Sequence, residues 1–462
     1  MKYTLLFDFG STFTKSTVVD RDARRVCYTF RTPSTVGTDA SIGLRRCLEA
    51  ISKVIGQSEM MAAEKLASSS AAGGLRMIVI GLTESLSMTA GRNAAWGAGA
   101  KVLRTFSGLL TDGDVEEIAA IQPEIIFLCG GYEQGNSDWV WQNAEKLAAH
   151  PAITMPVVYA GNSQIASAVR VLFYRYEKTC IIAKNIIPAI GELSIESSVE
   201  AVRDIFMKRI THMKGFDTVK KNIGDIVMPT PAAVLQGVRF LAEGTTNQPG
   251  WEQLMLIDMG GATTDVHSYA AEDSLEGVHI VGAKEPKAKR TVEGDIGARE
   301  SCNSLLETAD MKRIEKLSGL TAAEIRSCRD ERLAHHEFVA RTEKEIRFEN
   351  AMAMEAVRVS VRRHAGRMYA GFAEGAQEIQ KGKNLRNVKK IIGTGGPIID
   401  NPDPKNVLTQ ALRTPQEKDV LLPETADFYL DKSYVFYAAG LLAKHDPELA
   451  FQILSESLTR LD

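Results

Sequence analysis

The sequence lacks the features that mark several classes of protein. Its 462 residues include only six cysteines and no Cys-x-x-Cys pair, so neither a disulfide framework nor a structural zinc site is indicated. No run of about 18 apolar residues occurs, as a membrane-spanning helix would need, and the first apolar run, broken by Asp8, is too short for a signal peptide. We therefore expect a cytoplasmic protein that does not enter the membrane.

Charge of one sign is also lacking. The formal net charge is −3, with Lys and Arg mixed among Asp and Glu along the chain. A binding surface for nucleic acid or for a membrane would carry a basic excess, so we expect neither partner. A chain of this length with 44% apolar residues can bury the cores of two substantial lobes.

Near the middle of the chain, an apolar strand ends in an acid and two glycines. The apolar run at residues 254–257 predicts a buried strand, and Asp258-Met259-Gly260-Gly261-Ala262-Thr263 then leads into a Thr-rich strand. A glycine turn can direct several N–H groups at one phosphate. Asp258 at the strand end is placed to hold hydrated Mg²⁺, which binds through one or two carboxylates and phosphate oxygens. Alone, the pattern equally fits a plain β-hairpin.

The N-terminus repeats this pattern. An apolar strand at residues 3–7 is followed by Asp8-Phe9-Gly10-Ser11-Thr12-Phe13-Thr14-Lys15 and a strand at residues 16–19. Two such hairpins, separated by roughly half the chain, predict one hairpin in each of two lobes that face each other across a cleft with the phosphates between them. We expect the lobes to span residues 1–229 and 230–462.

The paired hairpins predict which residues bind a nucleotide. Asp8 and Asp258 would position the metal. The phosphate-binding residues would be Gly10, Ser11, Thr12, Lys15, Gly260, Gly261, Ala262 and Thr263. A third strand at residues 389–392 ends in a further glycine turn, Gly393-Thr394-Gly395-Gly396, which we expect to seat the adenosine.

The remaining pattern predicts an α/β fold with mixed sheets flanked by helices. We expect an antiparallel strand at residues 25–30 and a loop at residues 67–74. We also expect a helix whose apolar stripe runs through Met368 to Phe372 and whose off-stripe arginines form a solvated basic face. Those arginines are Arg358, Arg362, Arg363 and Arg367. Further helices are expected at residues 39–55, 138–149 and 164–173, and strands at residues 77–81, 124–129 and 156–159. Helices containing Pro231 and Ala438 offer faces of small residues that would allow close crossing. The Cys129-Gly130-Gly131 turn is interpreted as a packing feature.

The order of these motifs resembles the phosphate 1, phosphate 2 and adenosine motifs of the actin/Hsp70/hexokinase ATPase superfamily, with the Pro231 and Ala438 helices as its connecting segments. More narrowly, the chain resembles the MutL/GlmL family associated with glutamate mutase, which is unrelated to the mismatch-repair protein that shares the MutL name. Besides the motifs at Asp8, Asp258 and Gly393, this likeness rests on the segments Ser69–Met77, Met228–Pro231 and Val292–Gly297.

The resemblance implies a two-lobed ATPase that uses ATP and Mg²⁺. It also implies a protein partner, an adenosylcobalamin-dependent mutase (glutamate mutase or an aminomutase), for which the chain would act as an ATP-driven reactivating chaperone. Which mutase is the client is not implied. The chain itself contains no Asp-x-His-x-x-Gly cobalamin motif.

Two alternatives remain open at this point. A metabolite kinase of the same fold needs a carboxylate base, for which Glu293 or Asp295 is a candidate; either residue would equally orient a hydrolytic water or cap a turn. The ATP-dependent iron–sulfur activator of 2-hydroxyacyl-CoA dehydratases begins with a similar Asp-x-Gly-Ser-Thr-x-x-Lys motif. That activator needs cysteines that bridge a cluster, and the spacing of Cys129 and Cys180 does not resemble that arrangement.

Overall fold

The computed structural model describes residues 1–10, 13–70, 75–210, 214–224, 226–271, 278–335, 338–370 and 378–462. The chain divides into two compact units. The first comprises Met1–Gln236, Val281–Pro286 and Tyr437–Leu449, and the second comprises Gly237–Ile280, Lys287–Phe436 and Ala450–Asp462. The division at residues 229 and 230 stays a prediction. No helix among the described residues is both long enough and apolar enough to cross a membrane.

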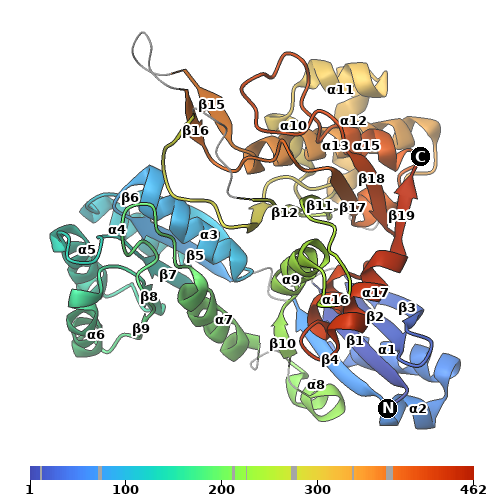
Figure 1. Ribbon diagram of the computed structural model, residues 1–462, viewed down its shortest axis with the longest axis horizontal. Coiled ribbons are helices and arrows are strands. Elements are labelled where there is room, and N and C mark those ends of the chain that lie inside the picture. Colours follow the sequence, from blue (N-terminus) through green and yellow to red (C-terminus); the bar gives the residue numbers. More distant parts are fainter. Residues whose placement is uncertain are drawn as a thin grey trace. The chain divides into compact units, whose positions relative to one another are not determined.

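The first sheet of unit 1 carries the N-terminal hairpin (Figure 1). Its strands are β1 (Tyr3–Phe9), β2 (Phe13–Asp20), β3 (Arg25–Pro33), β4 (Glu64–Ser69) and β10 (Ile226–Pro229), in the order β3-β2-β1-β4-β10. Strands β1, β2 and β3 are antiparallel neighbours, whereas β4 runs parallel to β1 and to β10. The helices α1 (Ala40–Ile55), α2 (Gln57–Ala62) and α8 (Phe216–Ile223) accompany this sheet. The predicted third antiparallel strand and first helix are confirmed.

The predicted loop at residues 67–74 is wrong at its start, because residues 67–69 belong to β4. Small polar residues are tolerated in this buried strand because their hydroxyls find acceptors. Ser68 Oγ donates to the carbonyl of Phe7 and Ser69 Oγ to that of Phe9. Residues 71–74 lie outside the described part of the chain.

The second sheet of unit 1 is fully parallel, as the alternation of strands and helices predicted. Its strands are β5 (Arg76–Gly81), β6 (Lys101–Ser107), β7 (Ile125–Leu128), β8 (Val157–Tyr159) and β9 (Cys180–Ile182), in the order β6-β5-β7-β8-β9. The helices that follow the strands in turn are η1 (Glu84–Met88) with α3 (Thr89–Gly97), α4 (Asp112–Ile121), α5 (Asp138–Ala149), η2 (Ser163–Ile165) with α6 (Ala166–Arg175), and α7 (Glu196–Ile210). Figure 1 shows α4, α5 and α6 on one face and α3 and α7 on the other. Residues 76–210 thus form a doubly wound module inserted between β4 and β10.

The main sheet of unit 2 repeats the first sheet of unit 1. Its strands are β11 (Leu254–Met259), β12 (Thr264–Tyr269), β14 (Ala288–Glu293), β17 (Lys390–Thr394), β18 (Asp427–Asp431) and β19 (Leu458–Leu461), in the order β14-β12-β11-β17-β18-β19. Strands β14, β12 and β11 are antiparallel neighbours, and β17 runs parallel to β11 and to β18. The first five strands therefore match β3-β2-β1-β4-β10 in order and direction. This duplication confirms the mixed α/β fold of the actin/Hsp70/hexokinase class.

The other elements of unit 2 surround this sheet. They are α10 (Cys302–Thr308), α11 (Met311–Ser318), α12 (Ala322–Ala334), α13 (Glu343–His364), α14 (Gly396–Ile399), α15 (Pro404–Thr409), and a small sheet of β13 (His279–Ile280), β16 (Ile379–Lys381) and β15 (Arg367–Tyr369). The longest helix, α13, buries Phe348, Val357 and Val361 in the core.

Two expectations for the α13 region are wrong. The helix ends at His364 and does not reach Met368, because the backbone is extended at Ala365 (φ −74°, ψ 156°) and continues as strand β15. Phe372 lies outside the described residues. The four arginines do not form a solvated basic face, since each is ion-paired with a carboxylate. The pairs are Arg358–Glu355, Arg362–Glu417, Arg363 with Glu293 and Asp295, and Arg367–Asp419.

Helices α9 (Thr230–Glu243) and α16 (Phe436–Leu442) cross closely through small residues, as predicted. A Cβ at Gly440 would lie 1.9 Å from the carbonyl oxygen of Ala233, and one at Gly237 would lie 2.6 Å from that of Phe436. The chain passes between the two units inside these helices and again inside α17 (Pro447–Ser457).

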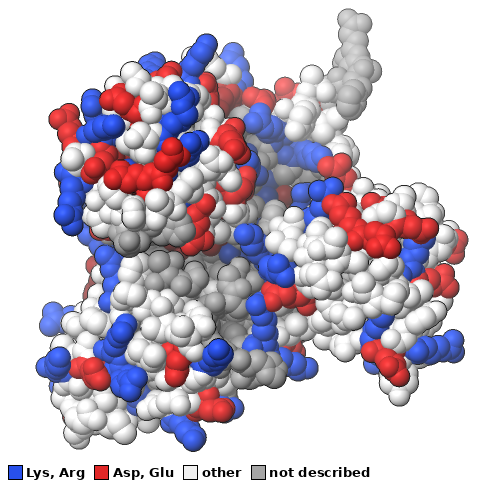
Figure 2. All heavy atoms as spheres, turned by 180° about the vertical axis from the view of Figure 1, so that it is seen from behind, with Lys and Arg blue, Asp and Glu red and all other residues white. Residues whose placement is uncertain are grey.

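On the face displayed in Figure 2, acidic and basic side chains are interspersed, so an anionic ligand of that face depends on local donors.

Candidate functional site

Asp8 is a buried carboxylate at the end of the first hairpin. Its side chain is 2% exposed, and its backbone pairs with Lys15 on β2 and Ser68 on β4. Thr230 Oγ1 donates to Asp8 Oδ1 at 2.6 Å, and Lys15 Nζ lies 3.7 Å from Oδ2. Burial raises the pKa of Asp8, while Lys15 and the Thr230 hydrogen bond act in the opposite direction. A cation at this carboxylate would favour its charged form.

Gly10 closes the turn of the same hairpin. Its N–H donates to the carbonyl of Phe13 at 3.0 Å, and Ser34 Oγ donates to the Gly10 carbonyl at 2.6 Å. A Cβ at residue 10 would lie 2.6 Å from the Phe13 carbonyl oxygen, so only glycine fits without a shift. Ser11 and Thr12 lie outside the described residues, and their predicted contact with a phosphate stays a prediction.

Asp258 occupies in unit 2 the position that Asp8 has in unit 1. It lies on β11. Its backbone pairs with Asp265 on the antiparallel strand β12 and with Thr394 on the parallel strand β17. Arg290, which is 4% exposed, pairs with Asp265 at 3.3 Å. Asp258 Oδ2 instead accepts a hydrogen bond of 2.7 Å from the Tyr434 hydroxyl. Asp265 is therefore neutralised by an arginine, whereas Asp258 is oriented by a hydroxyl.

The turn after Asp258 uses its carbonyls within the protein and leaves N–H groups for a ligand. Ala298 N, Arg299 N and Ser301 Oγ donate to the carbonyls of Gly260, Gly261 and Ala262 at 3.1, 2.8 and 2.6 Å. Gly260 N donates to the Thr263 carbonyl. Within the described residues, the N–H groups of Gly261, Ala262 and Thr263 donate to no other part of the chain. Three such donors in one turn suit an anion.

The segment that begins at Gly297 supports this turn, and the sequence indicates it only through the family motif that ends at Gly297. A Cβ at Gly297 would lie 2.5 Å from both the Gly261 carbonyl oxygen and the Ala262 carbonyl carbon, so glycine lets this segment pack against the turn. Arg299 also pairs with Glu349 at 2.9 Å, which ties the segment to α13. The glycine was the only sequence signal for this contact.

The glycine turn after β17 lies against Asp258. Gly395 has a φ of +87°, and a Cβ there would lie 2.1 Å from the Met259 carbonyl oxygen and 2.8 Å from Asp258 Oδ1. At Gly393 a Cβ would meet Ile398 at 2.7 Å, whereas at Gly396 the nearest atom is 3.9 Å away. The structure thus brings the predicted adenosine turn and the second hairpin together. It also shows that packing within the chain itself requires glycine at residue 395.

Glu293 and Asp295 share one arginine. Arg363 Nη1 donates to Glu293 Oε2 at 2.6 Å and to Asp295 Oδ1 at 3.1 Å. Glu293 pairs across the sheet with Thr264, at the start of the strand that follows the hairpin turn. Burial raises the pKa of Glu293, and the bond from Arg363 opposes that shift. Arg363 engages only Oε2 of Glu293, so a proton from water or from a hydroxyl substrate would go to the other carboxylate oxygen.

The donor sets fit a hydrated Mg²⁺ better than a metal with many protein ligands. Among the described residues, no three His, Cys, Asp or Glu side chains come together as a metal cluster. Each hairpin instead supplies one carboxylate, Asp8 or Asp258, and Mg²⁺ retains several waters while it binds one or two carboxylates and phosphate oxygens. Asp8 in unit 1 and Asp258 in unit 2 are thus each suited to contribute one carboxylate to such an ion.

The family is decided by comparison with known proteins. A family model described as MutL protein matches residues 4–458. The chain belongs to the MutL family. It is 39% identical over 459 residues to Protein MutL of Clostridium tetanomorphum, an alignment that covers 99% of each chain. This is the MutL family that the motifs indicated, which is distinct from the DNA mismatch-repair protein of that name.

Solved structures show only remote likeness to this MutL-family chain. Nucleotide-free acetone carboxylase is 13% identical, with 95% of this chain and 70% of that chain covered and a TM-score of 0.39. Xylulose kinase from Bifidobacterium adolescentis is 11% identical, with 100% and 96% covered and a TM-score of 0.33. At these scores the likenesses carry no argument about the site, which rests on the hairpins themselves.

Proposed function

We propose that this MutL-family protein binds and hydrolyses Mg-ATP and uses the cycle to reactivate an adenosylcobalamin-dependent mutase, either glutamate mutase or an aminomutase. The observation that carries the proposal is the duplicated sheet. In each copy one strand, β1 or β11, carries an aspartate at its next-to-last position, Asp8 or Asp258, and a glycine turn follows the strand. A protein that only folds around these strands has no need of the same buried or oriented carboxylate twice.

Different residues would bind the metal ion and the phosphates of ATP. Asp8 and Asp258 position hydrated Mg²⁺, which, when bound, supplies positive charge to the phosphate oxygens. The N–H groups of Gly261, Ala262 and Thr263 donate to phosphate oxygens, and Lys15 adds positive charge at the first hairpin. Phosphoryl transfer then depends on positioning and charge neutralisation, with little covalent chemistry by the protein.

The output of the cycle is a change in conformation. Converting a two-state protein from 1:99 to 99:1 needs about 5.5 kcal/mol of differential affinity between the two nucleotides. Hydrogen bonds to a charged group contribute about 1.5 to 3 kcal/mol each, so two to four bonds to the γ-phosphate suffice. A mutase that holds damaged cobalamin would be the client, and the conformational change would open it so that the inactive cofactor leaves.

The competing functions make different chemical demands. A metabolite kinase transfers the γ-phosphate to an acceptor, but its candidate bases, Glu293 and Asp295, are both bound to Arg363. An iron–sulfur activator needs accessible thiolates. Cys129 is fully buried, and burial raises the pKa of its thiol and raises the pKa of the Cys180 thiol to about 12. A colourless purified protein would exclude the iron–sulfur activator alternative.

Phosphate release with Asp8→Ala, Asp258→Ala and Asp419→Ala tests the ATPase. Asp419 is a matched control, because its carboxylate pairs with Arg367 at half-exposed positions. We expect the first two variants to lose Mg²⁺-dependent hydrolysis by about 100-fold or more, as when charge stabilisation of the transition state is removed, while the control retains it. Full activity in both hairpin variants, with circular dichroism showing intact folds, would refute the assignment.

A further inference from the structure

A pocket in unit 1 lies apart from the Asp8 hairpin, in the doubly wound module. Its volume is about 240 Å³. Three segments line it, residues 82–87 after β5, residues 130–136 after β7 and residues 185–187 after β9. All three follow the carboxyl ends of parallel strands, so the pocket lies at that edge of the sheet.

The strand order makes this edge a place for a ligand. From β5 the chain crosses to β6 on one side, and from β6 it returns to β7 on the other side of β5. The helix after β5, α3, lies on one face of the sheet, and α4, after β6, lies on the other (Figure 1). The winding therefore reverses between β5 and β7. In open α/β sheets, ligands bind outside the carboxyl ends of the strands at such a switch point.

We propose that this pocket binds a neutral, planar heterocycle through its flat faces and its acceptor edge. The walls are apolar and come from Leu82, Leu86, Ile186 and Ile187. The lining contains no residue of either hairpin, and the proposal does not depend on the proposed function.

The turn after β7 provides hydrogen-bond donors in the lining. Gly130 and Gly131 have φ values of +132° and +78°, a backbone that other residues rarely adopt. Their carbonyls are occupied, by Asn162 N at 3.1 Å and Asn185 Nδ2 at 2.9 Å. Within the described part of the chain, the N–H groups of Gly130, Gly131 and Tyr132 donate to no other residue. A ligand with oxygen or nitrogen acceptors on its edge would satisfy them.

The charges around the pocket favour a neutral ligand over a phosphate. Among the described residues, no Lys or Arg side chain lines it. Glu133 accepts a hydrogen bond of 2.8 Å from the lining residue Asn185, and Glu84 lies in the first turn of η1, directly after the lining residue Thr83. A phosphate normally needs an arginine, a lysine or an unopposed helix start. Here the Glu133 carboxylate opposes an anion.

The size of the pocket limits the ligand to one or two rings. A volume of about 240 Å³ is below the 300–1,000 Å³ that is usual for drug-sized ligands, by order of magnitude. The lining residues Leu86 and Ser87 lie in the π-helical turn η1 (Glu84–Met88), a conformation that is rare overall but frequent at functional sites. A fused bicyclic heterocycle matches both the volume and the apolar walls.

Benzimidazole, which is neutral at pH 8, is a suitable probe of the full-length protein without nucleotide. We expect calorimetry and saturation-transfer NMR to give a Kd on the order of 1 mM, as the ligand efficiency of a nine-atom fragment allows. Benzoate, a negatively charged aromatic probe, and inorganic phosphate should bind at least about tenfold more weakly. Leu86→Phe, which fills the pocket, should weaken benzimidazole by about tenfold or more.

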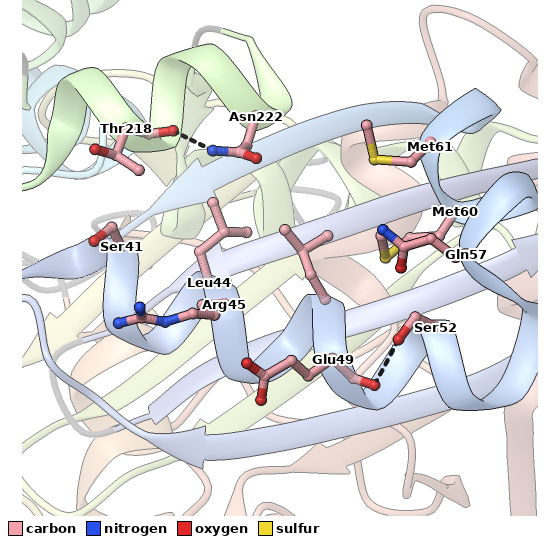
Figure 3. Close-up of a pocket in the computed structure, with 11 residues that line it drawn as sticks. Ser41, Leu44, Arg45, Glu49, Ser52, Gln57, Met60, Met61, Thr218 and Asn222 are labelled. Atoms are coloured by element: carbon pink, nitrogen blue, oxygen red, sulfur yellow. Dashed lines mark hydrogen bonds between the residues drawn. The ribbon is translucent and has the colours of Figure 1, made fainter.

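A second cavity provides the matched control (Figure 3). It has a volume of about 310 Å³, is lined by α1, α2 and α8, and includes the charged side chains Arg45 and Glu49. Leu48→Phe, in that lining, should leave benzimidazole binding unchanged. If Leu86→Phe does not fold, Leu86→Ala removes part of the apolar wall and should weaken the probe as well.

Three results would overturn the proposal. They are no saturable binding of benzimidazole, equal binding of benzoate or phosphate, and benzimidazole binding that is indifferent to both substitutions at Leu86.

Discussion

The hydroxyl of Tyr434 donates a hydrogen bond of 2.7 Å to Asp258, although Tyr434 itself has a φ of +53°. A bulky residue in the left-handed region is uncommon and costs about 1 to 3 kcal/mol. The surrounding structure keeps it there, because Asp431 accepts two hydrogen bonds from the N–H of the next residue, Val435. The strained tyrosine therefore fixes the direction of the carboxylate that is proposed to hold the metal.

Tyr434→Phe should weaken Mg²⁺ dependence while the fold is retained. Loss of the hydroxyl removes a hydrogen bond that orients Asp258, and removal of such an orienting partner typically costs about 10- to 100-fold in metal affinity. We expect the Mg²⁺ concentration for half-maximal hydrolysis to rise about tenfold, with nearly the same rate at saturation. An unchanged Mg²⁺ titration would show that the tyrosine does not act through the metal.

Gly261→Ala should separate a ligand contact from a folding requirement. A Cβ at residue 261 would meet only the Arg299 side chain, at 3.5 Å, so the apoprotein should unfold close to the wild-type temperature. A phosphate that approaches the N–H groups of this turn would meet the new methyl group, and we expect ATP affinity to fall by about tenfold.

Gly297→Ala is the comparison for that substitution. Its Cβ would lie 2.5 Å from the turn backbone, so it should lower the melting temperature in addition to weakening ATP. If Gly261→Ala binds ATP as well as the wild type does, the turn is not a phosphate site.

Asp8→Asn should reveal the cost of the buried charge. Burial raises the folded-state pKa of Asp8, so the wild type loses stability relative to the variant as pH rises from the ordinary Asp range through that raised value. We expect the variant to gain free energy of unfolding relative to the wild type between pH 4 and pH 8, measured by denaturant unfolding without nucleotide. A difference that is constant or falls with pH would contradict the burial effect. Mg-ATP hydrolysis should be lost at every pH.

Glu417→Gln should show the opposite pH dependence. Two hydrogen bonds of 2.6 Å from Arg362 lower the pKa of Glu417 from 4.5 to about 2. The stabilisation is complete above the ordinary pKa and is lost as pH falls from 4.5 towards 2. The variant should lose about 1 to 2 kcal/mol of unfolding free energy near pH 7, and the difference should shrink below pH 4.

Glu424→Gln is the control for that experiment. Glu424 pairs with Arg413, but its side chain is 71% exposed. A surface pair of this kind contributes little, so the variant should stay near the wild type from pH 7 down to pH 3. Equal losses in the two variants would show that the Arg362 pair has no special role.

The local parts of the site could be predicted from the sequence, because a strand, an acid and a glycine turn are adjacent in the chain. Asp8, Asp258 and the turns after them could therefore be named, and their shared place in two copies of one sheet bears out the fold class. Thr230 and Tyr434 could not be given roles in this way, since they reach Asp8 and Asp258 over 222 and 176 residues.

The order of the strands in a sheet cannot be predicted from the local sequence either. The alternation of strands and helices predicted a parallel sheet, but it did not predict that β7 lies beside β5. Because of this pairing, Gly130 and Gly131 after β7 line the same pocket as the residues after β5. The small polar residues at the end of β4 predicted a loop. They belong to a buried strand because the serine hydroxyls donate to carbonyls of β1, which are distant in the sequence. The ion pairs of the α13 arginines could not be predicted, because their carboxylate partners, such as Glu293 and Glu417, lie far from them in the chain.

Recovery of an inactivated mutase tests the central claim most directly. An adenosylcobalamin-dependent aminomutase or glutamate mutase blocked by damaged cobalamin is incubated with this protein, Mg-ATP and fresh adenosylcobalamin, and its activity is followed over time. The account predicts recovery with wild-type protein and cleavable ATP, and none with Asp258→Ala or a non-hydrolysable nucleotide. Equal recovery without nucleotide, or transfer of the γ-phosphate to a small metabolite, would contradict it.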